Sequence, residues 1–507
     1  MLGSRAQEHL AGGSVTPARG VVAAGHPLSA EAGADALRAG GNAVDAALGA
    51  MLTSFVAEPL LTGLGAGGYM LVVTPAGEAT LLDFFVEAPG RGAHPARREP
   101  LVPIDVSFGD VVQRFNVGAS SVGAYGTPAG VHAAAERFGS LPLADLAAGA
   151  AAHAREGVVV TPEQGYIFEI LGPILAATPE AAALFAPPGR PLRPGERCVQ
   201  PELADALERL ARDGPDPFYT GEVGAAVVDR LAEHGGSLTR EDLAAYAVVD
   251  RAPVRVPYRG REVLTNPPPS AGGTLIAYAL ALLDSGPGPP ALAEVIDAME
   301  HAQSERTPDF LAGLARPDFL DEFLRGRLGS TTHISVLDAD GWACSVTCSN
   351  GASSGIVVPG TGIHLNNMMG EEDLNPLGFH RHPPGRRMPS MMAPTVVLNE
   401  GAPQLVLGSA GSNRIRSAIL QTIVGVVDHG LAAGPAVERP RVHLEAGKLY
   451  AEPGVPADEL EATGWPLARF RALNVFFGGV QAAERDAITG AFSGGGDPRR
   501  GGAAVVV

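Results

Sequence analysis

The alternation of hydrophobic and polar residues predicts two β-hairpins. Residues 331–338 and 342–350 each alternate with a period of two, and Asp340-Gly341 supplies a turn between them. Residues 69–73 and 79–85 repeat this pattern around a Pro-Ala-Gly turn. After residue 331 the chain is predicted to be predominantly β. Other short strands are expected at 254–256, 261–264, 395–398 and 404–407.

A period near 3.6 predicts helices elsewhere. Ser29 is expected to cap a helix through residues 31–38, which Gly40-Gly41 can end. Asn42 and Asp45 match a capping box for a second helix. The apolar stripe of that helix consists of Val44, Leu48, Met51, Leu52 and Phe55.

Later segments continue the mixture of helices and strands. Thr239 is expected to cap a helix that begins at residue 240. Helical patterning also marks residues 130–154, 202–212, 223–234 and 415–427. Helices mixed with antiparallel hairpins indicate the α/β class.

Composition and charge restrict the function classes. The 507 residues carry 37 basic and 55 acidic side chains, and the net charge of −18 disfavours nucleic acid and anionic membranes as partners. The first ten residues lack the apolar core of a secretory signal. No apolar run reaches the roughly 20 residues of a membrane span. We therefore expect a soluble, cytoplasmic protein.

The cysteines indicate neither a disulfide nor a metal site. Cys344 and Cys348 share one face of a predicted strand but lie about 13 Å apart along it, too far for a disulfide. With Cys198 the count is odd. No His/Cys cluster has zinc-binding spacing. Buried free thiols, and no metal or other cofactor, are expected.

Thr331 begins the first hairpin and is a candidate nucleophile. If the chain cuts its own Ser330–Thr331 bond, Thr331 gains a free α-amine beside its hydroxyl. An α-amine has a pKa of roughly 7.7 to 8.0, so it can accept the hydroxyl proton near neutrality. The alternative is that Thr331 only starts a strand, as β-branched residues commonly do.

Motifs along the whole chain favour Thr331 as a nucleophile over Thr331 as an ordinary strand residue. The run from Thr331 through residues 362–369, Gly-Ile-His-Leu-Asn-Asn-Met-Met, resembles the start of the small subunit in the γ-glutamyltransferase family, whose members are self-processing N-terminal-nucleophile hydrolases. Other stretches agree with that family in order and spacing: 18–27, 38–47, Glu58-Pro59 leading to 65–68, 126–130, 267–273, 391–395 and Asp497-Pro498-Arg499.

The resemblance implies a fold and a division of the chain. The implied fold is a four-layer αββα sandwich with helices outside two stacked sheets. Cleavage would give a large chain, 1–330, and a small chain, 331–507, which stay interleaved as one globular unit. The substrate would be a small γ-glutamyl or related amide.

The resemblance also implies site residues. Gly411 and Ser412 match the paired oxyanion glycines, with Ser412 a departure that keeps its backbone N–H. Ser349 and Asn350 match positions that orient the nucleophile and bind the amino-acid end of the substrate. Glu371 corresponds to an acidic residue that pairs with the substrate α-ammonium. Ser390 matches the first of two serines that contact the substrate carboxylate.

Three departures concern the substrate. Phe85 stands where relatives that act on glutathione carry an arginine for the glutamyl α-carboxylate. Met368 replaces a glutamine, and Met391 replaces the second serine. The leading hypothesis is a γ-glutamyltransferase-like enzyme that passes an acyl group from Thr331 to water or an amino acid. The alternatives are an N-terminal-threonine amidase or acylase for another acyl group, and a non-processing binding or scaffold homologue.

Overall fold

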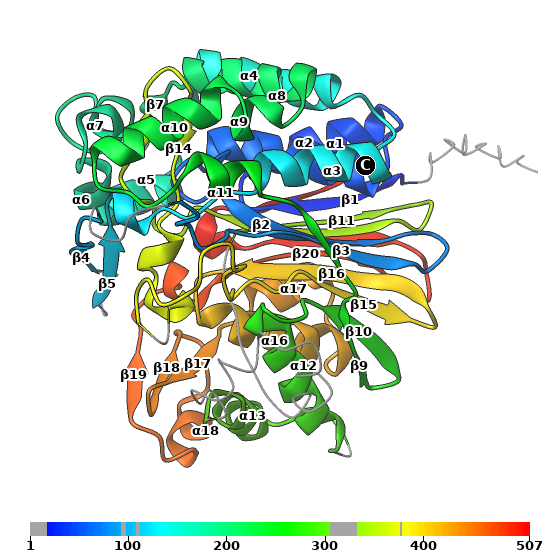
Figure 1. Ribbon diagram of the computed structural model, residues 1–507. Coiled ribbons are helices and arrows are strands. Elements are labelled where there is room, and N and C mark those ends of the chain that lie inside the picture. The colour runs from blue at the N-terminus through cyan, green and yellow to red at the C-terminus, as the bar shows by residue number, and fades with distance from the viewer. Residues whose placement is uncertain (1–17, 93–97, 108–111, 287, 305–331, 376–377) are drawn as a thin grey trace, which may run out of the picture.

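Two antiparallel sheets are stacked at the centre of the computed structural model, which describes residues 18–92, 98–107, 112–286, 288–304, 332–375 and 378–507 (Figure 1). One sheet has seven strands, in the order β22 (Ala503–Val506), β1 (Gly20–Ala24), β11 (Thr332–Asp338), β12 (Ala343–Ser349), β2 (Gly67–Val73), β3 (Ala79–Phe84) and β8 (Val249–Arg251). The other has six, in the order β21 (Phe492–Gly496), β20 (Gly479–Arg485), β16 (Ala402–Ala410), β15 (Thr395–Asn399), β10 (Arg261–Thr265) and β9 (Val254–Tyr258).

Helices cover both outer faces of this pair of sheets. The seven-stranded sheet is covered by α1 (Pro27–Arg38), α2 (Ala43–Ala57) and α3 (Thr127–Phe138), with α4 (Leu143–Glu156) and α8 (Pro201–Asp213) packed above them. The six-stranded sheet is covered by α12 (Ala271–Asp284), α16 (Arg414–Val427) and α17 (Ala433–Glu438), with α13 (Leu292–Ser304) beyond. The predicted four-layer αββα sandwich is confirmed.

Smaller elements surround the sandwich. At one end lie β4 (Val102–Ser107), β5 (Val112–Val117), β6 (Val158–Val159), β7 (Arg197–Cys198), α5 (Pro162–Ile170), α6 (Gly172–Leu175) and α7 (Pro179–Phe185). The helical side is completed by α9 (Asp216–Tyr219), α10 (Glu222–Glu233) and α11 (Arg240–Ala244). Beside α13 are β17 (Val442–Glu445), β18 (Lys448–Ala451), β19 (Leu467–Arg469) and α18 (Ala457–Ala462).

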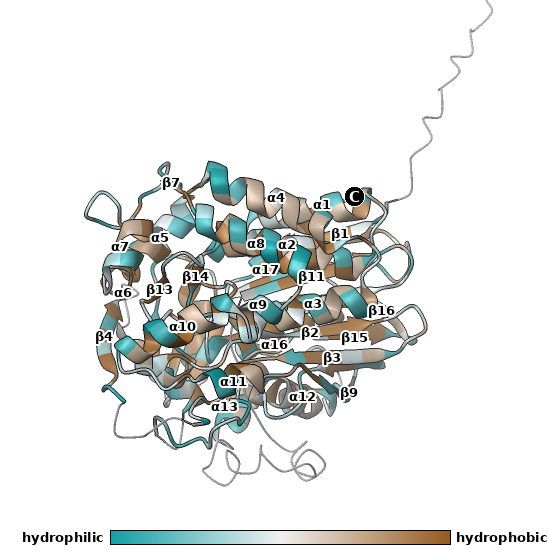
Figure 2. Cartoon of the chain, turned by 45° about the horizontal axis from the view of Figure 1, so that its top comes forward, coloured by the Kyte–Doolittle hydropathy of each residue, from teal (hydrophilic) through white to brown (hydrophobic). Residues whose placement is uncertain are grey.

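Side chains that alternate along a strand pack into two different hydrophobic cores, one between the sheets and one under the helices. On β2, Tyr69 and Leu71 face the space between the sheets, whereas Met70 and Val72 pack under the helices. Both faces are buried because successive side chains of a strand point to opposite sides and each side of this sheet is covered. Figure 2 shows the resulting contrast between hydrophobic central strands and hydrophilic outward faces of helices such as α10.

Both predicted hairpins are present. β11 pairs with β12 from Thr332 opposite Cys348 to Leu337 opposite Ala343. The turn is closed by Asp338, whose carboxylate accepts hydrogen bonds from the backbone N–H groups of Trp342 and Ala43, each at 2.9 Å. The second hairpin is β2–β3.

Two predicted caps are confirmed and one is wrong. Asn42–Asp45 and Thr239–Asp242 form capping boxes at α2 and α11. The cap of α1, however, is His26 and not Ser29, because the helix already begins at Pro27. The His26 Nδ1 accepts a hydrogen bond from the backbone N–H of Leu28 at 3.2 Å. Proline at the first helical position suits a helix start, since its missing N–H would have no partner there.

Each sheet combines strands from before and after residue 331. In the seven-stranded sheet, β11 from the later segment lies between β12 and β1, and Gly20 pairs with Asp338. In the six-stranded sheet, β10 from the earlier segment pairs with β15 from the later one. The two predicted chains therefore contribute strands to the same two sheets.

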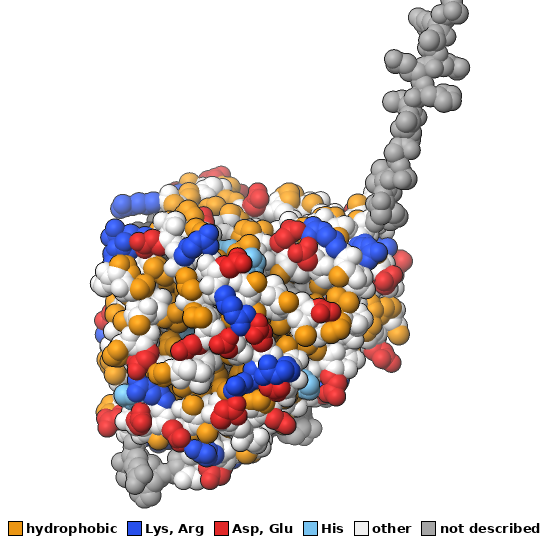
Figure 3. Space-filling model, turned by 90° about the horizontal axis from the view of Figure 1, so that it is seen from above, with side chains coloured by type: hydrophobic (Ala, Val, Ile, Leu, Met, Phe, Trp, Pro, Cys, Tyr) orange, Lys and Arg blue, Asp and Glu red, His pale blue; other side chains and the backbone are white. Residues whose placement is uncertain are grey.

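The surface above α4 and α8 carries interspersed acidic and basic side chains and no single-sign patch in that view (Figure 3). Arg155 of α4, for example, pairs with Asp205 and Glu208 of α8. Within the described ranges, no helix is long and apolar enough to cross a membrane, and no three His, Cys, Asp or Glu residues cluster as metal ligands would. All three cysteines are buried free thiols, as predicted.

Candidate active site

A pocket opens where β12 ends. Its volume is about 940 Å³, counting the space open to solvent at its mouth. Ser349, the last residue of β12, lines it, and Cys348 just before it pairs with Thr332, the first described residue of β11. Ser330 and Thr331 lie outside the described residues.

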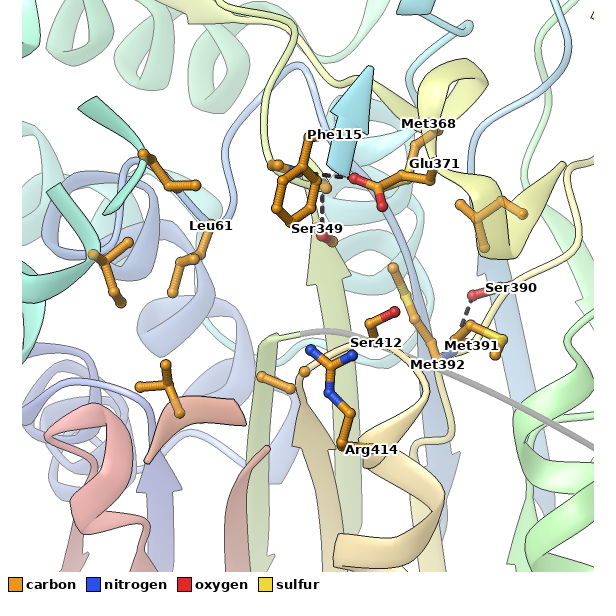
Figure 4. Close-up of a pocket in the computed structure, with 18 of the residues that line it drawn as sticks. Leu61, Phe115, Ser349, Met368, Glu371, Ser390, Met391, Met392, Ser412 and Arg414 are labelled. Carbon is orange, nitrogen blue, oxygen red and sulfur yellow. Dashed lines mark hydrogen bonds between the residues drawn. The ribbon is translucent and has the colours of Figure 1, made fainter. Parts of the chain in front are cut away.

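Five of the six predicted site residues that the structure describes line this one pocket (Figure 4). They are Ser349, Glu371, Ser390, Gly411 and Ser412. They come from segments up to 63 positions apart in the chain, so their convergence is a property of the fold. The sixth, Asn350, does not line the pocket.

Asn350 is fully buried behind the pocket wall. Its backbone N–H donates to the Leu61 carbonyl at 2.9 Å, and its carbonyl accepts from the Asn367 N–H at 3.1 Å. The next residue, Gly351, lines the pocket in its place. Asn350 thus joins two loops that border the pocket.

Glu371 is held above Ser349 by a short turn. Its Oε1 accepts from the backbone N–H of Ala352 at 3.2 Å, and Figure 4 shows the carboxylate reaching toward the end of β12. Asn375 fixes the turn, because its side-chain amide donates to the carbonyls of Met368 and Glu371 at 3.0 and 2.9 Å. Glu371 supplies the pocket with a negative charge.

Ser390 lies across the pocket from Ser349. Its Oγ accepts from the Met392 N–H at 3.0 Å, and its backbone carbonyl accepts from the Ala271 N–H at 2.9 Å. A parallel bridge to Ser270 fixes this segment against the start of α12. The neighbouring Met391 and Met392 make that wall largely apolar.

Gly411 and Ser412 form the turn between β16 and α16, and both have positive φ, +120° and +51°. A Cβ on Gly411 would come within 2.8 Å of the Gly478 Cα, so glycine is required there. Their carbonyls accept from the N–H groups of Arg414 and Ile415 at 3.2 and 3.1 Å, which starts α16. The turn therefore stands at the positive end of a 14-residue helix, where developing negative charge is stabilised.

Two arginines that the motif analysis did not select also line the pocket. Arg414 is 7% exposed, donates from Nε to the Phe476 carbonyl at 2.9 Å and lies over the Phe476 ring. Figure 4 shows its side chain rising beside Ser412. The other is Arg500, which follows the Asp-Pro-Arg motif directly. No local sequence pattern distinguishes these two arginines from the others, so they are identified as pocket residues only from the structure.

The three departures noted in the sequence, Phe85, Met368 and Met391, all line the pocket. Phe85 stacks on Tyr69 with 5.4 Å between ring centroids. The nearby Arg387 does not replace the missing arginine. It donates to the Phe85 carbonyl, lies near Asp83 and is not among the residues that line the pocket.

A buried histidine connects the two sheets below the pocket. His333 Nδ1 accepts from the Thr347 hydroxyl at 2.8 Å, and Nε2 lies 2.8 Å from Ser335 Oγ. Ser335 donates its own proton to the Gln481 carbonyl of β20, so Nε2 is the protonated nitrogen. Burial lowers the pKa of His333 to about 3, and the ring is neutral. This network holds the start of β11 against the second sheet.

Comparison with known proteins agrees with this architecture. Two stacked antiparallel sheets between helices, with a pocket at the end of a central hairpin, define the class of N-terminal-nucleophile hydrolases. The gamma-glutamyltranspeptidase family model matches residues 29–507, and the chain belongs to this family.

Individual relatives cover nearly the whole chain. The acylase ACY 1 proenzyme of Pseudomonas sp. (strain SE83) is 35% identical, with 89% of this chain and 88% of the relative aligned. The glutathione hydrolase proenzyme of Escherichia coli (strain K12) is 32% identical, with 90% and 87% aligned. The crystal structure of cephalosporin acylase from Bacillus halodurans superposes with a TM-score of 0.83 at 27% identity, covering 100% of this chain and 99% of that one.

Proposed function

We propose that the protein is a self-processing enzyme that cleaves a γ-glutamyl or related amide with Thr331 as nucleophile. The observation that carries this proposal is the convergence of Ser349, Glu371, Ser390, Gly411 and Ser412 on the pocket at the end of the β11–β12 hairpin. Membership of the gamma-glutamyltranspeptidase family supports this proposal, as does the similarity to an acylase proenzyme and to a glutathione hydrolase proenzyme.

The reaction has two halves. The Thr331 hydroxyl attacks the amide carbonyl, its proton passes to the Thr331 α-amine and then to the departing nitrogen, and the C–N bond breaks. An acyl ester on Thr331 remains. Water, or an amino acid, attacks the ester and restores the hydroxyl.

The pocket residues have distinct roles in this reaction. Backbone N–H groups of Gly411 and Ser412 stabilise the oxyanion, helped by the positive end of α16. Glu371 pairs with an α-ammonium group on the acyl chain, and Ser390 hydrogen-bonds its carboxylate. Ser349 orients the nucleophile.

The direct test is the intact mass of the purified protein beside its Thr331→Ala and Thr331→Ser variants. We expect wild type to yield chains 1–330 and 331–507, because cleavage needs the hydroxyl. Thr331→Ala should stay whole, whereas Thr331→Ser keeps a hydroxyl and should still be cut. A wild-type chain that stays uncut after prolonged incubation would refute self-processing and favour the scaffold alternative.

A second candidate is an acylase for an acyl group other than glutamyl. Phe85, Met368 and Met391 favour it, because they place apolar side chains in the pocket where the family has polar partners. Loss of a charge-assisted hydrogen bond weakens binding by about 1.5 to 3 kcal/mol. Turnover of γ-glutamyl-4-nitroanilide and of simple acyl-4-nitroanilides by fully processed protein separates the candidates, and exclusive cleavage of the simple anilides would select the acylase.

A further inference from the structure

The oxyanion turn, Gly411–Ser412, is joined to a hairpin from a later part of the chain. Asn413 follows the turn directly and is the N-cap residue of α16. Its side-chain amide donates a hydrogen bond to Glu445 Oε1 at 2.5 Å. Glu445 is the last residue of β17 and pairs with Lys448 of β18. A side chain 32 positions further along the chain therefore holds the residue next to the turn.

His443, two residues before Glu445 on β17, makes a second contact with the same helix. Its Nδ1 lies 2.8 Å from Ser417 Oγ, and its Nε2 lies 3.4 Å from Glu445 Oε2. Residues two apart on a strand share a face, and so do residues four apart on a helix. His443 and Glu445 therefore meet Ser417 and Asn413 as two matched pairs. We call these four side chains the α16–β17 contact.

The protons of the α16–β17 contact have a defined arrangement. Burial raises the pKa of Glu445, but the hydrogen bond from His443 and the charges of Arg414 and Arg416 outweigh it and hold that pKa below its ordinary value. Glu445 is thus a carboxylate and can only accept hydrogen bonds. Burial lowers the pKa of His443, so the ring is neutral. It donates from Nε2 to Glu445 and accepts at Nδ1 from the Ser417 hydroxyl.

Glu445 also supplies a negative charge that the start of α16 itself lacks. The first turn of α16 contains Arg414 and Arg416 and no acidic residue. Positive side chains at the positive end of a helix are unfavourable, and a nearby carboxylate offsets them. Arg416 in addition donates from Nε to the Asn413 carbonyl at 3.1 Å. Asn413 is therefore held through both its side chain and its backbone.

The α16–β17 contact affects the pocket without lining it. None of its four side chains is among the described residues that line the pocket, whereas Gly411 and Ser412 are. The tip of the β17–β18 hairpin takes no part, since an added Cβ on Gly447 would meet no atom within 4 Å. The influence of Glu445 on the pocket therefore passes through Asn413 to the backbone of the oxyanion turn.

We propose that Glu445 is a positioning residue that fixes the backbone N–H groups of Gly411 and Ser412 toward the reacting carbonyl. This inference rests on the proposed function, which makes those groups the oxyanion donors. Such donors stabilise the charge that develops in the transition state and not the bound substrate. Loss of Glu445 therefore lowers kcat and leaves KM nearly unchanged.

Steady-state kinetics of processed variants test this role with whichever anilide the wild type cleaves. We expect Glu445→Ala to lower kcat about tenfold and to change KM less than about twofold, because the donors remain but are misplaced. Glu445→Gln keeps an oxygen for Asn413, and its amide can donate to His443 once the ring proton moves to Nδ1. Its kcat should stay within about threefold of wild type.

Asn413→Ala removes the donor instead of the acceptor and should reproduce the loss in Glu445→Ala. Because the two residues act through one hydrogen bond, the double variant should lose no more kcat than either single variant. Unchanged kcat in Glu445→Ala or in Asn413→Ala would overturn the proposal, and so would additive losses in the double variant.

A variant at the other end of α16 provides the matched control. Asp428 is the C-cap residue of this 14-residue helix, about 20 Å from its start. Its carboxylate is 2% exposed and accepts from the Tyr258 hydroxyl at 2.5 Å and from Arg259 Nε at 2.9 Å. Asp428→Ala should lower the stability of the protein but leave kcat unchanged. An equal loss of kcat in Asp428→Ala would show only a general dependence on the stability of α16, and would refute a positioning role.

Amide hydrogen exchange distinguishes this proposal from the proposed function, because it needs no turnover. Peptides covering residues 408–417 are followed by mass spectrometry in wild type and in the same variants. Glu445→Ala should exchange about tenfold faster there, the effect of losing one charge-assisted hydrogen bond, whereas Glu445→Gln and Asp428→Ala should match wild type. Failure to cleave any anilide counts against the proposed function, and unchanged exchange in Glu445→Ala counts against the role of Glu445.

Discussion

At the residue scale, the turn at Gly411–Ser412 has the strictest backbone requirements near the pocket. Both residues have positive φ, and Gly411 lies against Gly478. We expect Gly411→Ala to lower kcat about 100-fold, because the added methyl displaces the oxyanion donors. Ser412→Gly should keep kcat within a few-fold, since glycine adopts a φ of +51° without strain and retains the N–H. Steady-state kinetics of processed protein measure both effects.

A glycine outside the pocket provides the control for this experiment. Gly447 also has positive φ, +72°, but a Cβ there would meet no atom within 4 Å. Gly447→Ala introduces similar backbone strain in the β17–β18 turn and should leave kcat unchanged. If Gly411→Ala were as active as Gly447→Ala, the turn would have no part in catalysis.

At the element scale, the start of α2 depends on a single buried carboxylate. Asp45 is fully buried and accepts hydrogen bonds from the Asn42 N–H at 2.8 Å, the Ser140 N–H at 2.9 Å and the Leu141 N–H at 3.1 Å. These bonds cap α2 and fix the loop between α3 and α4. The chain runs from the end of α2 directly to Leu61, which lines the pocket, so the position of α2 affects the pocket wall.

Asp45→Ala should therefore lower the free energy of unfolding by about 2 to 4 kcal/mol, through the lost cap and the buried N–H groups left unpaired. Urea denaturation followed by circular dichroism measures this loss. Asp35→Ala in α1 is the matched control: its side chain is 68% exposed and paired with Arg38, and its removal should change the unfolding free energy by less than about 1 kcal/mol. Equal losses in the two variants would contradict the structural role of Asp45.

At the scale of the whole molecule, the proposed cleavage would leave two chains that share both sheets. β11 and β12 of the later segment lie between β1 and β2 of the earlier one. Separating the chains would break four strand pairings, β1–β11, β1–β22, β12–β2 and β10–β15, and expose both hydrophobic cores. We expect the processed chains to co-elute in size-exclusion chromatography in native buffer and to separate only in denaturant. Separate elution in native buffer would contradict this interleaving.

The sequence was sufficient to predict features that depend on neighbouring residues. The two hairpins, the capping box of α2 and the Thr239 cap of α11 follow from side-chain period and from side chains a few positions apart, so nearby residues determine them. The one wrong cap, Ser29 in place of His26, is also local. Histidine is not a preferred capping residue, and the pattern therefore pointed to the serine three positions later.

The tertiary structure decided what the local pattern left open. Alternation along β11 predicted a strand, but only the stacked second sheet buries its polar face and gives the Ser335 hydroxyl its acceptor, the Gln481 carbonyl of β20. Motif resemblance identified residues around the pocket but not Arg414 or Arg500, because no spacing in the sequence indicates that they line the same pocket as Ser349. The physical reason is the range of the interactions: periods and caps act over a few residues, whereas the pocket depends on the pairing of strands that lie hundreds of residues apart, as Gly20 with Asp338.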